Sequence, residues 1–147
     1  MVAAQIGADE RGRIDSSVAV ECYLAEMRDN LLPDCSNLRV LKRGTRIKNK
    51  EFMDKHRYND YDVRDILREL RVWNYYETIE KQGCPDAYAF GYYDSNRNLE
   101  IYLKFSMEEI EDERFLNIDV ISFHDPEREV KYAYLSLKPA KRSDQNG

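Results

Sequence analysis

Four polar side chains on two strand-like segments have the chemistry to cleave a phosphodiester. The segment LEIYLKF alternates apolar and polar residues, so Tyr102 and Lys104 share its polar face. Ser122 and His124 share one face of a second apolar segment, VISFH. If the two strands pair, one register brings all four side chains together. An imidazole, an ammonium group and a phenol could then supply the base, the positive charge and the acid that metal-free attack by a ribose 2′-hydroxyl needs.

The same residues also fit simpler interpretations, which the sequence leaves open. Tyrosine and lysine on the polar face of a strand are commonly ordinary solvent-facing residues, and His124 could be a structural histidine at the end of a buried strand. His56, the second histidine, lies in a polar segment and is expected on the surface of a helix. Ser122, His124 and Asp125 are too close together in an extended segment to form a serine-protease triad.

Sites for metals or cofactors are not predicted. The spacing of the two histidines and of Cys22, Cys35 and Cys84 is typical neither of zinc ligands nor of a disulfide framework. The acidic run EEIEDE lacks the glycine turn and the Asp-x-Asp start of a calcium loop. No glycine-rich phosphate-binding motif occurs. We therefore expect chemistry by side chains alone, with no cofactor.

Three segments in the first half have the apolar spacing of helices that would support these strands. DSSVAVECYLAEMRDNLLP places Val20, Leu24, Met27 and Leu31 on one stripe before Pro33. NDYDVRDILREL is the clearest amphipathic helix, and KNKEFMDKH predicts a shorter one before it. The expected N-caps are Asp15 or Ser16, Asn49, and Asn59 or Asp60.

After Leu70 the apolar period changes to that of strands. Segments rich in aromatic and β-branched residues predict strands at VWNYYETIE, AYAFGYY, LEIYLKF, FLNIDVISF and EVKYAYLSL, the fourth being central in the sheet. Helices followed by strands predict an α+β fold in which helices pack on one face of a twisted antiparallel β-sheet. We expect a single domain over residues 15–138, with mobile polar ends at 1–14 and 139–147.

Charge is distributed unevenly along the 147 residues. The net charge is −5, which opposes binding to a polyanion, but the stretch 38–57 carries eight Lys or Arg against two acids. That stretch predicts either an RNA-binding patch or an ordinary solvated surface. No run of about 20 apolar residues and no signal-peptide pattern occurs, so we expect a cytoplasmic protein that does not enter a membrane.

The segment from Arg46 to Tyr134 resembles the MqsR-like toxins of bacterial type II toxin–antitoxin systems, in particular a Gram-positive and cyanobacterial branch. The similar pieces are RIKNKEF, DYDVRDILREL, NYYETIE, YAFGYY, EIYLKF and VISFHDPEREVKYAY. The last two are the most specific, because an IYLK strand followed by ISFH, an acidic turn and YxY is typical of that branch. The resemblance covers roughly ninety residues.

This resemblance implies a RelE-like fold and a metal-independent endoribonuclease that cleaves mRNA, held inactive by a cognate antitoxin with a helix-turn-helix DNA-binding domain. Tyr102 and Lys104 match the family's IYLK strand, and His124 stands where better-known members have a lysine. Glu77 stands where those members have another lysine, and their glutamine has no counterpart near Pro85.

We assign roles on this basis. His124 would be the general base or acid, Lys104 the electrostatic stabiliser, and Tyr102 a proton donor or positioning group. The cations expected to anchor the RNA backbone are Arg43, Arg46 and Lys48. The alternative is a catalytically inactive relative that binds a protein partner, which Glu77 and the net negative charge favour.

Overall fold

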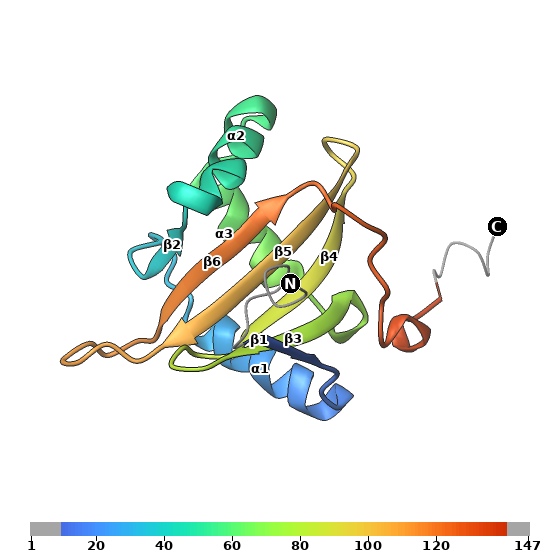
Figure 1. Cartoon of the computed structure of the whole chain (residues 1–147), viewed down its shortest axis with the longest axis horizontal. Coiled ribbons are helices and arrows are strands. Elements are labelled where there is room, and N and C mark those ends of the chain that lie inside the picture. The colour runs from blue at the N-terminus through green and yellow to red at the C-terminus, as the bar shows by residue number, and fades with distance from the viewer. Residues whose placement is uncertain (1–9, 141–147) are drawn as a thin grey trace, which may run out of the picture.

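The computed structural model of the chain describes residues 10–140, which form a mixed α+β structure around one six-stranded sheet (Figure 1). The sheet order is β1-β3-β4-β5-β6-β2, and every neighbouring pair is antiparallel except β2 and β6, which are parallel. The strands are β1 (Glu10–Arg13), β2 (Leu38–Val40), β3 (Tyr75–Lys81), β4 (Ala87–Asp94), β5 (Leu99–Glu108) and β6 (Asn117–His124). The expected α+β class is confirmed, and β6 is an internal strand as predicted.

Three α-helices accompany the sheet: α1 (Ser17–Asn30), α2 (Ile47–His56) and α3 (Asp60–Glu69). Figure 1 shows α1 and α3 behind the sheet, while α2 packs beside β6. Short 3-10 turns, η2 (Gly44–Arg46), η3 (Val72–Asn74) and η4 (Leu135–Leu137), connect or end these elements. Within residues 10–140, no helix has the length and apolar character needed to cross a bilayer.

The core lies between the helices and one face of the sheet. Ile101, Leu103 and Phe105 of β5 are fully buried on that face, as the alternation of the strand predicted. The apolar stripes of α1 and α3 cover them, and their buried members are Val20, Leu24, Met27, Val63, Ile66 and Leu67. The opposite sheet face carries the polar residues, and we call it the open face.

Local capping chemistry fixes where two of the helices begin. The Ser16 side chain accepts a hydrogen bond from the Ala19 backbone N–H, so Ser16 is the N-cap of α1. Asn59 caps α3 and forms a reciprocal capping box with Asp62. In both cases the structure selects one of the two residues that the sequence proposed.

The predicted cap of the short helix is wrong. Helix α2 begins at Ile47, so Asn49 lies inside it and is 1% exposed. Its amide donates to the carbonyls of Leu41 (2.8 Å) and Ile121 (2.9 Å) and accepts from the Phe123 N–H (2.9 Å). Strand β2 ends at Val40, so the Asn49 side chain continues the ladder along the outer edge of β6. A distant strand therefore decides the role of this residue.

Two other expectations are corrected. Residues 10–13 do not belong to a mobile end but form strand β1, which pairs with β3. The pairing rests on backbone hydrogen bonds, so the residue types of this segment show no apolar alternation that would predict a strand. Residues 1–9 of the predicted N-terminal end and residues 141–147 of the predicted C-terminal end lie outside the described residues.

The segment EVKYAYLSL is not a strand. It runs past β4 and ends in η4, with the Ala133 N–H bonded to the Tyr75 carbonyl at 3.1 Å. On that edge of β3, β1 already pairs with residues 78–81, which leaves only the first residues of β3 for this segment. Val130 is buried and Tyr134 stacks on Tyr75, whereas Leu135 and Leu137 of η4 stay exposed.

Candidate active site

The register of β5 and β6 brings the four predicted side chains together on the open face. Tyr102 lies directly opposite His124, and Lys104 lies opposite Ser122. The ring centroids of Tyr102 and His124 are 5.6 Å apart. The predicted pairing of these two strands, in a register that brings the four side chains together, is therefore confirmed.

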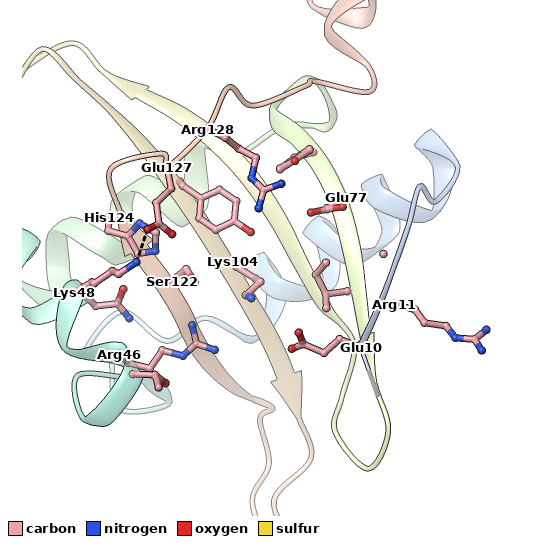
Figure 2. Close-up of a pocket in the computed structure, with 16 residues that line it drawn as sticks. Glu10, Arg11, Arg46, Lys48, Glu77, Lys104, Ser122, His124, Glu127 and Arg128 are labelled. Carbon is pink, nitrogen blue, oxygen red and sulfur yellow. Dashed lines mark hydrogen bonds and ion pairs between the residues drawn. The ribbon is translucent and has the colours of Figure 1, made fainter. Parts of the chain in front are cut away.

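These residues line a cleft of about 420 Å³ on the open face (Figure 2). Side chains from β1, β3, β5 and β6 form its base, while η2, α2 and the loop after β6 form one wall. On β4, the residues opposite Lys104 and Tyr102 are Ala89 and Gly91, which carry almost no side chain. The Tyr132 ring and hydroxyl lie where a Cβ on Gly91 would stand, so a larger residue at this position would need that side chain to move.

The cleft is more positive than the protein as a whole. Its charged lining comprises the cations Arg46, Lys48, Lys104 and Arg128 and the carboxylates Glu10, Glu77 and Glu127, while Arg11 borders the cleft with its side chain pointing away (Figure 2). Lys48 and Glu127 form an ion pair beside His124. Arg46, Lys104 and Arg128 make no ion pair with any of residues 10–140. Unpaired cations around a cleft form a site for an anion such as phosphate.

Burial changes the pKa values of Lys104 and Tyr102 in opposite directions. It lowers the pKa of Lys104, and the nearby Arg46 guanidinium lowers it further, against the opposing effect of Glu10 and Glu77. Burial, together with the charge of Glu77, raises the pKa of Tyr102 to about 12. The Tyr102 phenol therefore keeps its proton at neutral pH and acts as a hydrogen-bond donor rather than a base.

The backbone fixes the tautomer of His124. Its Nδ1 lies 2.7 Å from the Asp125 carbonyl oxygen, which can only accept, so Nδ1 carries a proton. Nε2 is then the nitrogen left to exchange a proton with a substrate. This anchoring gives the end of β6 a defined proton-transfer group, consistent with either an acid or a base.

Glu77 is a carboxylate of the cleft whose charge acts on both Lys104 and Tyr102. Burial raises its pKa, while Arg128 and Lys104 lower it. It lies against β1, where a Cβ on Gly12 would come within 3.0 Å of its Oε1. Tyr76, its neighbour on β3, meets Tyr102 edge-on at 6.3 Å between ring centroids.

Two of the three predicted RNA-binding cations, Arg46 and Lys48, line the cleft, whereas Arg43 does not. Sequence reasoning missed Arg128, although it follows His124 by only four residues, because nothing in PEREV indicates that the loop turns back over the sheet. Glu10 was also missed, since it lay in a segment expected to be mobile. His56 lies on α2 against Phe52 and outside the cleft lining.

No three His, Cys, Asp or Glu side chains within residues 10–140 are grouped closely enough to hold a metal ion. Comparisons of the chain with protein-family models, with curated proteins and with solved structures found no match. The likeness to the MqsR-like toxins therefore rests on the sequence motifs quoted above.

Proposed function

We propose that this protein is a toxin-type endoribonuclease with a RelE-like fold that cleaves mRNA without a metal ion. The observation that carries the proposal is the opposed pairs Tyr102–His124 and Lys104–Ser122 in a cleft with unpaired cations. The sequence resemblance to the MqsR-like toxins supports the same conclusion independently of the geometry.

Each group has a chemical task in this reaction. Lys104, Arg46 and Arg128 would hold the scissile phosphate and offset the charge that develops on its oxygens. His124 would transfer a proton through Nε2, and the Tyr102 hydroxyl would orient the phosphate by donating a hydrogen bond. Attack by the 2′-oxygen forms the bond to phosphorus and breaks the bond to the 5′-oxygen. The products are a 2′,3′-cyclic phosphate and a 5′-hydroxyl.

The test is cleavage of a defined RNA in EDTA, with the product ends identified by mass spectrometry. His124→Ala should lower the rate by about 10²–10⁴, the usual contribution of a positioned acid or base. His124→Lys should recover part of this loss by restoring a positive charge near the phosphate. His56→Ala, the matched control, should leave the rate unchanged because His56 lies outside the cleft lining. Cleavage that disappears in EDTA or survives His124→Ala would refute the mechanism.

The proposal includes an antitoxin, encoded beside this chain, with a helix-turn-helix DNA-binding domain. Co-expression of the neighbouring reading frame should yield a stable complex and suppress the growth arrest that the wild type alone causes. Growth arrest that the neighbouring product does not relieve would remove the toxin–antitoxin assignment and leave the ribonuclease activity standing.

A second candidate is a catalytically inactive relative that binds a protein partner through the same face. The position of Glu77 favours it, because a carboxylate beside Lys104 and Arg128 competes with a phosphate for those cations. The absence of cleavage of any RNA by antitoxin-free wild type would select this candidate.

A further inference from the structure

We propose that Glu77 is the general base of the reaction, taking the proton from the attacking 2′-hydroxyl while His124, as the acid, protonates the leaving 5′-oxygen. This inference rests on the proposed ribonuclease function and assigns the two proton transfers that the sequence left undivided.

The sheet register places Glu77 on the far side of Lys104 from β6. Glu77 pairs with Ala89, Ala89 with Lys104, and Lys104 with Ser122, so the four residues form one row across β3, β4, β5 and β6. Ala89 carries only a methyl group, so no large side chain of β4 stands between Glu77 and Lys104. Glu77 and His124 therefore flank the ammonium group that would hold the phosphate, as Figure 2 shows.

The span between the two groups suits an in-line reaction. Three strand spacings of about 4.8 Å, and two residues of about 3.4 Å along the strand, separate their backbones by about 16 Å. A base and an acid on opposite sides of a reacting phosphate need about 9–10 Å, from hydrogen bonds of about 2.6–3.2 Å and reacting atoms about 3–3.5 Å apart. The backbone separation exceeds this requirement by about 6 Å. The Glu77 and His124 side chains are long enough to cover that difference if both lean toward the phosphate.

The surroundings of Glu77 suit a base. Among residues 10–140 its carboxylate has no hydrogen-bond or ion-pair partner, so both oxygens can accept a proton. The groups facing it are Lys104 and Tyr102 from β5 and Arg128 from the loop after β6. From β1 come Gly12 and, further along the strand, the carboxylate of Glu10, while β3 adds Tyr76 and β4 presents Ala89. Burial raises the pKa of the carboxylate and so makes it more basic than an exposed one, while Arg128 and Lys104 oppose that rise.

The proton balance of the step is complete. Glu77 gains the 2′-hydroxyl proton as the 2′-oxygen bonds to phosphorus, and the imidazolium of His124 gives its Nε2 proton to the 5′-oxygen as that bond breaks. Glu77 ends protonated and His124 neutral, and exchange with water restores both. The cleavage rate should therefore have a bell-shaped pH dependence whose acidic limb belongs to Glu77.

Two substrates separate the base from the acid. One is an RNA dinucleotide, and the other is a nucleoside 3′-(p-nitrophenyl phosphate), whose leaving group departs without a proton. Glu77→Gln should lower the rate on both substrates by about 10²–10⁴, and it should abolish the acidic limb. His124→Ala should lower the rate on the dinucleotide by a similar factor. On the p-nitrophenyl ester the same variant should be nearly as fast as wild type, because that leaving group needs no proton.

Glu100→Gln is the matched control, because Glu100 is an exposed carboxylate on the open face of β5 and outside the cleft lining. It should leave both rates unchanged. An uncleavable RNA with a 2′-deoxyribose at the cleavage position should bind Glu77→Gln at least as tightly as wild type, since a negative charge near the phosphate is lost.

The outcomes distinguish the inference from the function beneath it. A Glu77→Gln rate equal to or above that of wild type, while His124→Ala remains impaired, would overturn the base assignment and leave the ribonuclease function intact. Weaker binding of the uncleavable RNA would also overturn it, because it would show that Glu77 holds substrate rather than moves a proton. Failure of wild type to cleave any RNA would overturn both.

Discussion

Replacing Asn49 by alanine should destabilise the protein and disable the cleft together. Asn49 is almost fully buried and makes three hydrogen bonds to backbone groups of Leu41, Ile121 and Phe123. At about 0.5–1.5 kcal/mol each, and with a buried Phe123 N–H left unpaired, the loss should be about 2–4 kcal/mol. For a slope of about 2 kcal/mol per molar of urea, the unfolding midpoint should fall by about 1–2 M.

The same substitution tests how the site is built. Asn49 joins α2, next to Arg46 and Lys48, to the strand end that carries Ser122 and His124. RNA cleavage should therefore fall even at temperatures where the variant stays folded.

Lys50→Ala is the matched control for the Asn49 variant. Lys50 is exposed on the same helix and loses only a solvent-exposed pair with Asp54, so its removal should change the stability little. An Asn49→Ala variant within about 0.5 kcal/mol of wild type would refute the view that this amide holds the helix to the strand.

Two further predictions follow from the charges in the cleft. Arg46→Ala and Lys48→Ala should each weaken RNA binding and reduce the salt slope of the binding constant by roughly 0.7. Arg43→Ala should change neither quantity, because Arg43 lies outside the cleft lining. If a salt titration shows equal effects of all three substitutions, the basic patch has another role. Lys104→Met should raise the melting temperature at neutral pH, because burial and Arg46 lower the pKa of Lys104 and make its charged form costly in the folded state. That cost fades as pH rises through the lowered pKa toward the ordinary value of 10.5, so the gap between variant and wild type should close in that range; a lower melting temperature for Lys104→Met would contradict it.

The sequence by itself determined the elements whose side chains alternate between core and solvent. The period of two in β5 separated the buried Ile101 and Leu103 from Tyr102 and Lys104, and the structure keeps this division. The caps at Ser16 and Asn59 were also predictable, as one of two candidates each, because their hydrogen bonds reach only three residues along the chain. Signals of this kind are local, so they survive in a single sequence.

Only the tertiary structure decided which segments complete the cleft. Pairing of β1 with β3, the backbone contacts of Asn49, and the return of Arg128 over the sheet join residues far apart in sequence or separated by an irregular loop. These contacts rest on backbone hydrogen bonds and on where a loop turns, and neither leaves a period in residue type. Apolar spacing reports whether a side chain is buried, but not which distant strand lies beside it. The amino-acid pattern therefore predicts the facing side chains on β5 and β6, and the fold supplies the charges around them.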